Sequence, residues 1–160
     1  MTLSDEPIRD KDNGQADREA VDQGVRRLDV VVVTGDHPVF EGEADRVVAP
    51  AILGQISILP HHAAYLAVLE PGELVVRDGD QEESFAIGGG FIEVRDDIVI
   101  VLADSAERAH EIDIRRAHEA RRRARTLVRR YRNQPESQAA RQALRRSRAR
   151  IKVAQRISRR

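Results

Sequence analysis

Short apolar runs separated by turn residues dominate the middle of the chain. Between residues 28 and 103 the runs are four to six residues long and rich in valine, isoleucine and leucine, and no helix-length period lies between them. Runs of this length and composition are typical of β-strands. About nine of them at close spacing predict an antiparallel β-sandwich or barrel over residues 28–103.

Glycine and aspartate mark the turns between these runs. The three consecutive glycines at residues 88–90 are interpreted as a turn, because they lead into a strand-like segment and do not begin a helix. Two dipeptides have the composition of hairpin turns: Asp78-Gly79 and Asp96-Asp97.

After residue 103 the apolar residues recur every three or four positions, which is the period of an α-helix. The first such stripe contains Ala117, Ala120, Ala124, Leu127 and Tyr131, and the second contains Ala140, Leu144, Ser147, Ile151 and Ala154. Pro135 stands between them, and proline is tolerated in the first turn of a helix but not inside one. We therefore predict an antiparallel helical hairpin over residues 104–160, with helices at about 114–132 and 135–157.

Both helical stripes consist mostly of alanine, so the helices can approach closely but bury little apolar area. At about 25 cal/mol per Å², an alanine contact contributes less than the roughly 1.5–3 kcal/mol of a buried leucine. We therefore expect the hairpin to be weakly docked and able to move.

Charge divides the chain into unlike parts, although its formal net charge is zero. Residues 104–160 hold nineteen Lys and Arg against six Asp and Glu, an excess of 13, whereas residues 28–103 hold three against fourteen, a deficit of 11. Asymmetry of this size bears on the partners of a protein more than on its fold. Residues 1–27 mix both signs without an apolar period and are predicted to be a disordered extension.

The sequence offers little catalytic chemistry. The chain has no cysteine, which excludes disulfides and cysteine-ligated zinc, and its longest apolar run has seven residues against the ~20 needed to span a bilayer. His118-Glu119 opens like a zinc-protease motif, but Arg122 stands where the second histidine should be. Neither of the two lysines lies in a glycine-rich loop that could cradle phosphate. We interpret His61-His62 as a packed or solvated pair, and we predict neither a metal site nor an enzyme.

Two blocks of the strand-rich segment are distinctive in combination. The first lies at residues 39–63 and contains VFEGEAD, VVAP, ILP and HA; the second lies at residues 89–109 and contains GGFIEV and VLADSAERA. Together they resemble the epsilon subunit of the rotary proton-translocating ATP synthase. The resemblance implies a ten-stranded β-sandwich followed by a helical hairpin, which agrees with the prediction from periodicity. The chain departs from the family pattern in its arginine-rich hairpin and in the extension before residue 28.

The resemblance also implies a function. Members of the family are non-catalytic rotor subunits of the central stalk, and the sandwich would link the gamma subunit to the c-ring at the cytoplasmic face of the bacterial plasma membrane. The hairpin would lie folded or extend toward the catalytic alpha and beta subunits, where it would inhibit ATP hydrolysis. We expect membrane association only through the complex and no required cofactor. The inhibitory basic face would consist of Arg121, Arg122, Arg125 and Arg129.

A second implication of the resemblance concerns ATP as a regulatory ligand. Residues 112–117 read IDIRRA and match the ATP-sensing pattern of the family, which is Ile or Leu, Asp, two free positions, Arg and Ala. An ungapped alignment gives the implied site residues as Glu107, Asp113, Arg116, Arg123, Arg146 and Arg150. Arginine suits phosphate because its guanidinium group makes paired, charge-assisted hydrogen bonds. Asp113 is equally well placed to cap the first long helix, so both interpretations stay open.

Composition alone favours two other classes of protein. A basic helical arm could follow the phosphates of a nucleic acid, although Tyr131 is its only aromatic residue for base stacking. The alanine stripe could instead support a self-associating coiled-coil adaptor. The resemblance predicts neither of these: it implies no nucleic-acid binding and a monomer when the gamma subunit is absent.

Overall fold

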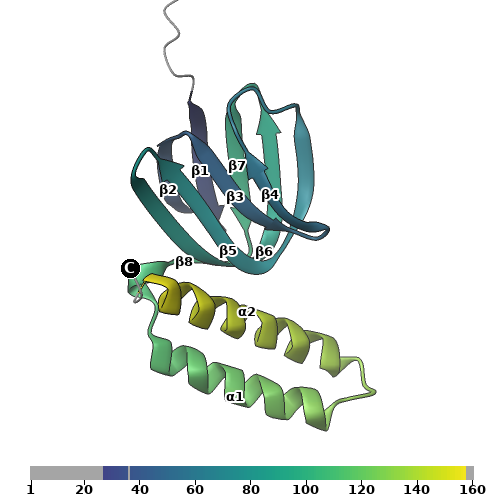
Figure 1. Ribbon diagram of the computed structural model, residues 1–160. Helices are drawn as coiled ribbons and strands as arrows, with labels where there is room; N and C mark the ends of the chain where they lie inside the picture. The colour runs from purple at the N-terminus through teal and green to yellow at the C-terminus, as the bar shows by residue number, and fades with distance from the viewer. Residues whose placement is uncertain (1–26, 36, 158–160) are drawn as a thin grey trace, which may run out of the picture.

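The structure of the chain is a computed structural model that describes residues 27–35 and 37–157 (Figure 1). Residues 1–26 of the predicted disordered extension lie outside this range. In chain order the elements are β1 (Leu28–Thr34), β2 (His37–Ala44), β3 (Arg46–Ala51), β4 (Gly54–Ile58), β5 (Tyr65–Asp78), β6 (Gln81–Arg95), β7 (Ile98–Ala103), β8 (Ala106–Arg108), the short 3-10 helix η1 (Ala109–Glu111), α1 (Ile114–Arg130) and α2 (Glu136–Ile157).

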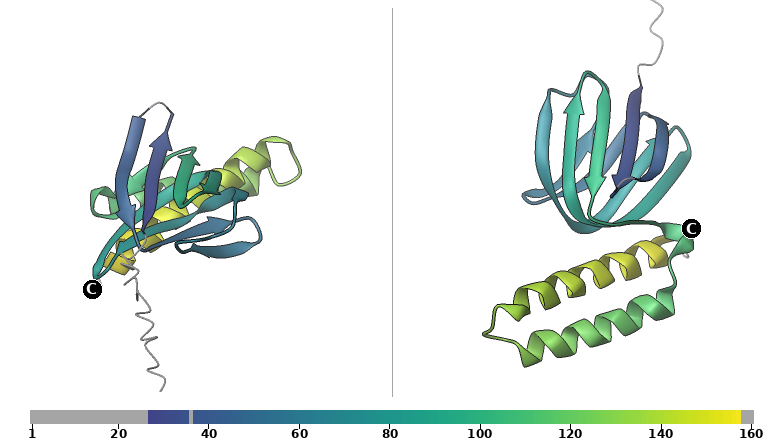
Figure 2. Two further views of the ribbon diagram at one scale, coloured as in Figure 1. Left: turned by 90° about the horizontal axis from the view of Figure 1, so that it is seen from above. Right: turned by 180° about the vertical axis from the view of Figure 1, so that it is seen from behind.

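The strands form a single hydrogen-bonded sheet in the order β2-β1-β7-β6-β5-β3-β4, with β8 paired to β6. Figures 1 and 2 show that this sheet curls round on itself, so that its strands face one another across a shared interior. Paired strands are antiparallel except β1 and β7, which run parallel. The predicted antiparallel sandwich is confirmed, with this one parallel pair inside it.

The described residues form eight strands where the resemblance implies ten, because β5 and β6 are long. Of the short apolar runs predicted as separate strands, those at residues 66–69 and 74–77 prove to be two parts of the single strand β5. The runs at residues 83–87 and 91–94 are likewise two parts of β6. The glycines at residues 88–90 therefore lie within a strand, and their interpretation as a turn was wrong.

Glycine is required at the middle of β6 for a steric reason. The φ angle is +110° at Gly89 and +131° at Gly90, which is the backbone region that side chains disfavour. A Cβ atom on Gly90 would lie 2.0 Å from the carbonyl oxygen of Leu102 in the neighbouring strand. The glycines thus let β6 change direction while its pairing with β5 continues. By contrast, the turn predicted at Asp96-Asp97 is confirmed, with positive φ at both residues. The turn predicted at Asp78-Gly79 lies one residue later, at Gly79-Asp80, because Asp78 still pairs with Gln81 at the end of β5.

The main hydrophobic core lies inside the curled sheet, and every buried member of it comes from β1 to β7. In β1, Leu28, Val30 and Val32 are buried while the intervening residues are more exposed, which is the alternation expected of a strand with one face inward. Phe85 is fully buried and meets the ring of Phe40 edge to face at 5.8 Å. The sandwich therefore has a core to which the helices contribute nothing.

A chain that ends at residue 111, after β8 and η1, should fold without the helical hairpin. The main core stays complete in this truncation, so circular dichroism should show cooperative melting. Ending the chain at residue 104 also removes β8, whose Arg108 donates a hydrogen bond to the Val39 carbonyl and stacks over Phe85. The shorter chain should therefore melt several degrees lower. Loss of folded signal in the longer chain would contradict a self-contained sandwich.

The hairpin consists of α1 and α2, which span residues 114–130 and 136–157 against the expected 114–132 and 135–157. Segment 104–113 is not part of it, since β8 and η1 lie there. Asp113 caps α1: its Oδ1 accepts hydrogen bonds from the backbone N–H groups of Arg115 at 2.9 Å and Arg116 at 3.1 Å. The two helices are antiparallel, and α2 lies between the sandwich and α1 (Figures 1 and 2).

Small residues form the seam between the helices. Ala117 and Ala124 are buried in α1, and α2 buries Ala140, Ser147, Ile151 and Ala154. The predicted α1 stripe is not buried along its whole length: Leu127, near its end, is 41% exposed. A second face of α2 meets the sandwich through Val153, which is fully buried and packs with Ala86, Ala109 and the partly buried Ile112. This contact is small, so apolar burial holds the hairpin to the sandwich only weakly.

Candidate functional site

A cleft of about 520 Å³ opens where the start of α1, the middle of α2 and β8 meet. Its lining residues are Ala106, Glu107, Glu111, Asp113, Arg116, Ala117, Ala120, Arg123 and Arg150. Five of the six residues expected to sense ATP are among them. They come from three elements, and only the folded hairpin brings Arg150 of α2 beside the first turns of α1.

An ion pair joins two of these residues across the cleft. Arg150 Nε donates a hydrogen bond to Glu107 Oε2 at 2.7 Å, and both side chains are about two-thirds buried. Glu107 lies in β8 and Arg150 in α2, so the pair also ties the hairpin to the sandwich. It fixes the direction of the Arg150 guanidinium group at the edge of the cleft.

Asp113, at the N-terminus of helix α1, has a depressed carboxyl pKa. The N–H of Arg116 is the main cause, and the N–H of Arg115 and the positive charges of both side chains act in the same direction. Because the pKa is lower in the folded chain, the cap stabilises the fold at neutral pH, and this contribution is lost as the pH falls through the folded pKa. Both hydrogen bonds use Oδ1, which leaves Oδ2 outside the cap.

Arg146, the sixth residue, does not line the cleft. It lies in α2 one turn before Arg150, and its Cδ is 3.1 Å from the position that a Cβ atom on Gly88 would take. The alignment placed it with the others because sequence spacing alone does not show that β6 bends beneath this part of α2. Arg146 therefore packs on the sandwich beside the cleft.

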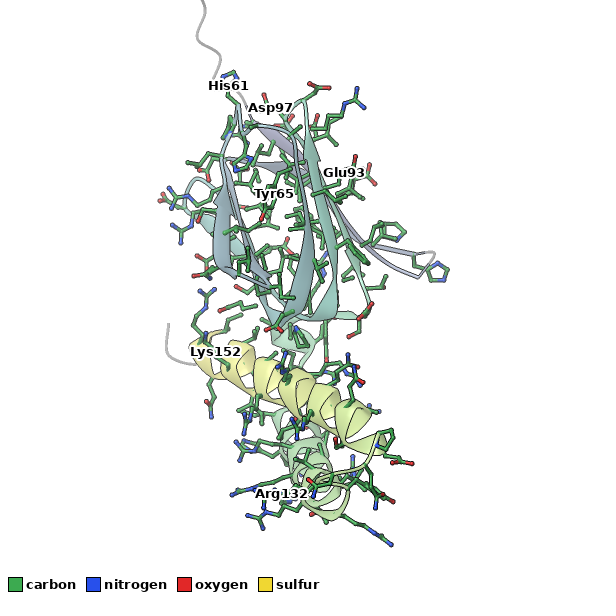
Figure 3. All side chains as sticks on the ribbon, turned by 90° about the vertical axis from the view of Figure 1, so that its right-hand side faces the viewer. His61, Tyr65, Glu93, Asp97, Arg132 and Lys152 are labelled. Carbon is green, nitrogen blue, oxygen red and sulfur yellow. The ribbon has the colours of Figure 1, made fainter. Side chains whose placement is uncertain are left out.

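The arginines of the expected inhibitory face all lie on α1. Arg121, Arg122, Arg125 and Arg129 are exposed. They fall within an arc of about 100° on the helix, since each residue turns it by about 100°. Figure 3 shows nitrogen-tipped side chains spreading from this helix into solvent, with Arg132 at the hairpin end. In the folded hairpin this surface is available to a partner.

His61 lies at the opposite end of the sandwich from the hairpin, with His62 next to it in the chain (Figure 3). The His61 backbone N–H donates to Asp97 Oδ1 at 2.5 Å, and the His62 ring packs edge to face on Tyr65. The interpretation of a packed or solvated pair is confirmed. Within residues 27–35 and 37–157, no three side chains of His, Cys, Asp or Glu gather closely enough to hold a metal ion.

An exposed apolar row crosses the outer face of β5, β6 and β7. Val68 pairs with Phe91, and Phe91 pairs with Leu102, so the three side chains stand side by side on one face. They are 44%, 52% and 54% exposed, and Leu66 beside Val68 is 70% exposed. Apolar residues grouped in this way are typical of a surface that another protein covers. Sequence analysis missed the row, because the three residues lie on different strands.

Comparison with known proteins covers both parts of the chain. Residues 27–109 match the family model described as ATP synthase, Delta/Epsilon chain, beta-sandwich domain, and residues 110–155 match the one described as ATP synthase, Delta/Epsilon chain, long alpha-helix domain. The chain belongs to the ATP synthase delta/epsilon family. The resemblance found in the two sequence blocks is thereby confirmed.

Relatives of this delta/epsilon chain carry a consistent name. Proteins named ATP synthase epsilon chain from Dehalococcoides mccartyi are 47% identical over 130 residues, which is 81% of this chain and 93% of theirs. The protein of that name from Acidithiobacillus ferridurans is 42% identical over 81% of this chain and 92% of its own. A chain in the Euglena gracilis mitochondrial ATP synthase structure shares the fold, with a TM-score of 0.69 at 21% identity and 81% coverage of each chain.

The delta/epsilon chain has no helix among its described residues that is both long and apolar enough to cross a membrane.

Proposed function

We propose that this chain is the epsilon subunit in the central stalk of an ATP synthase, a non-catalytic rotor component that links the gamma subunit to the c-ring. The observation that carries the proposal is the match of both the sandwich and the helical hairpin, in this order, to the two delta/epsilon family models. The names of the relatives support it, as does the exposed apolar row on the sandwich. Attachment to the bacterial plasma membrane would follow from the complex.

The apolar row of Val68, Phe91 and Leu102 is the surface proposed to pack on the gamma subunit. Its members lie on β5, β6 and β7, which are central strands of the sheet, and a partner that covers them removes apolar area from water. A fully buried Phe side chain contributes about 1.5–3 kcal/mol, so losing Phe91 should weaken the complex by roughly tenfold or more.

The substitution Phe91→Asp tests this docking surface. It should reduce co-purification of the gamma subunit at least tenfold, because the new carboxylate is desolvated in the complex. Leu127→Asp is the matched control: Leu127 is also an exposed apolar residue, but it lies on the hairpin. The control should retain gamma binding. Equal retention by both variants would show that the row does not contact gamma.

ATP is proposed as a regulatory ligand of the cleft between β8, α1 and α2. The volume of about 520 Å³ lies within the range of small-molecule sites, and Arg116, Arg123 and Arg150 can offer guanidinium groups to phosphates. The carboxylates Glu107, Glu111 and Asp113 line the same cleft and oppose a polyanion. Binding therefore requires that the N–H donors of the arginines point at the phosphates. Because the carboxylates repel the ligand, we expect weak binding, and we expect no turnover.

Such a ligand would stabilise the folded hairpin, because the cleft exists only in that state. A ligand bound by one state alone stabilises it by RT ln(1 + [L]/Kd), or about 2.7 kcal/mol at a hundredfold excess over Kd. This is comparable to the small apolar contact that Val153 makes with the sandwich. ATP would thus favour the folded hairpin over the extended, inhibitory one.

A further inference from the structure

Arginines of α2 dock on carboxylates of the sandwich at successive points along the helix. Arg145 Nη1 lies 2.5 Å from Glu70 Oε1 near the middle of α2, and Arg156 Nε lies 2.8 Å from Glu73 Oε1 near its C-terminal end. The first of these pairs is about half exposed, so solvent and salt weaken it. The second pair is much less exposed, so solvent and salt weaken it less.

Arg156 reaches into a notch of buried polar groups. Its Nη2 donates hydrogen bonds to Glu82 Oε1 and to Ser84 Oγ, each at 2.5 Å. The side chains of Glu73 and Glu82 are only 9% and 6% exposed. Between Arg156 Nε and Glu73 Oε1 the geometry is that of an ion pair and not of an aligned hydrogen bond.

Breaking the contacts of Arg156 costs more free energy than breaking the exposed Arg145–Glu70 pair, because Glu73 and Glu82 are buried. A carboxylate removed from water needs a positive partner, and the loss of that partner leaves an uncompensated charge. Glu82 has a second partner in Arg77, at 2.5 Å. Glu73 is held against Arg156, so opening α2 forces water to reach Glu73 again.

We propose that Arg156, with Glu73, Glu82 and Ser84, forms an electrostatic latch that keeps the hairpin folded on the sandwich without any ligand. The apolar contact beneath α2 consists of Val153 with three small or half-buried neighbours, and α2 is the helix that faces the sandwich. Release of the latch frees α2 together with α1. The carboxylates of the latch bind the basic hairpin within the chain, so an acidic partner has to compete with them for it. The latch does not depend on ATP binding.

Amide hydrogen exchange of the full chain, measured without nucleotide, tests the latch. In Arg156→Ala the amides of α2 should exchange at least about tenfold faster than in the unsubstituted chain, because a buried carboxylate has lost its partner. The amides of β6 and β7 should keep their rates, since the main core is untouched. Arg148→Ala is the matched control, because Arg148 is an exposed arginine of the same helix.

A second variant separates release of the latch from general unfolding. Glu73→Gln keeps the size of the side chain, removes its charge, and should accelerate exchange in α2 in the same selective way. Adding Arg156→Ala to Glu73→Gln should accelerate exchange less than it does in the unsubstituted chain. The latch is overturned if α2 exchanges no faster in Arg156→Ala than in Arg148→Ala, or if β6, β7 and α2 all accelerate equally in both Arg156→Ala and Glu73→Gln.

Discussion

Replacing the four arginines of the α1 face with glutamine should raise ATP hydrolysis by the assembled enzyme at least about fivefold, the lower end of usual coupling between sites. The substituted residues are Arg121, Arg122, Arg125 and Arg129. All four are exposed in the folded hairpin and lie on one side of α1, so they contribute to attraction by an acidic partner more than to the fold. Assembly should be unchanged, because the sandwich carries the proposed docking surface for gamma.

A matched variant removes four positive charges from elsewhere on the hairpin. Arg130, Arg141, Arg148 and Lys152 are also exposed, and replacing them with glutamine leaves the α1 face intact. Hydrolysis by this control should change much less. Because charge attraction between exposed groups is screened, added salt should reduce the difference between the two variants. Unchanged hydrolysis in the α1-face variant at low salt would contradict an electrostatic brake.

ATP binding to the isolated chain should be abolished by Arg116→Ala and should survive Arg132→Ala. Arg116 lines the cleft beside Asp113, whereas Arg132 lies at the hairpin end (Figure 3). Both substitutions remove one positive charge, so they separate a defined site from general attraction to the basic arm. Isothermal titration calorimetry measures the difference directly. Equal loss in both variants would indicate diffuse attraction, and no heat in the unsubstituted chain would leave the cleft without this ligand.

Asp113→Asn distinguishes the two interpretations of Asp113. Asparagine also caps helices well, so α1 should stay intact while the negative charge beside the cleft is lost. If Asp113 serves only as the cap, ATP should bind this variant at least as tightly as the unsubstituted chain. If its carboxylate contacts the ligand, binding should weaken although the helical content measured by circular dichroism is unchanged.

The sequence predicted those features that depend on local periodicity. Short runs rich in valine, isoleucine and leucine, and the three-to-four spacing around Ala117 and Ala124, identified a sandwich followed by two helices, because run length and helical period can both be seen in the local sequence. The bend in β6 was mistaken for a turn. Glycine permits both, and only the close approach of Gly90 to Leu102 shows which one the chain adopts.

Contacts between distant residues were beyond the reach of sequence analysis. Arg156 meets Glu82 across 74 positions, and no local pattern identifies which of the many arginines reaches which carboxylate. The opposite net charges of the two parts were the one available signal, and they were interpreted only as a sign of external partners. The same limit applies to Arg146, which the alignment grouped with Arg150 although it packs beside Gly88.

Co-purification tests the central claim most directly. An affinity-tagged copy of the full chain, expressed in its own cells and extracted in mild detergent at physiological ionic strength, should bring down gamma, the catalytic alpha and beta subunits and the c-ring subunit in constant proportions. Mass spectrometry identifies these partners, and nuclease treatment should leave their recovery unchanged. Three results would contradict the assignment as a rotor subunit: recovery of the chain alone, recovery as a self-associated oligomer, or recovery with nucleic acid in place of these subunits.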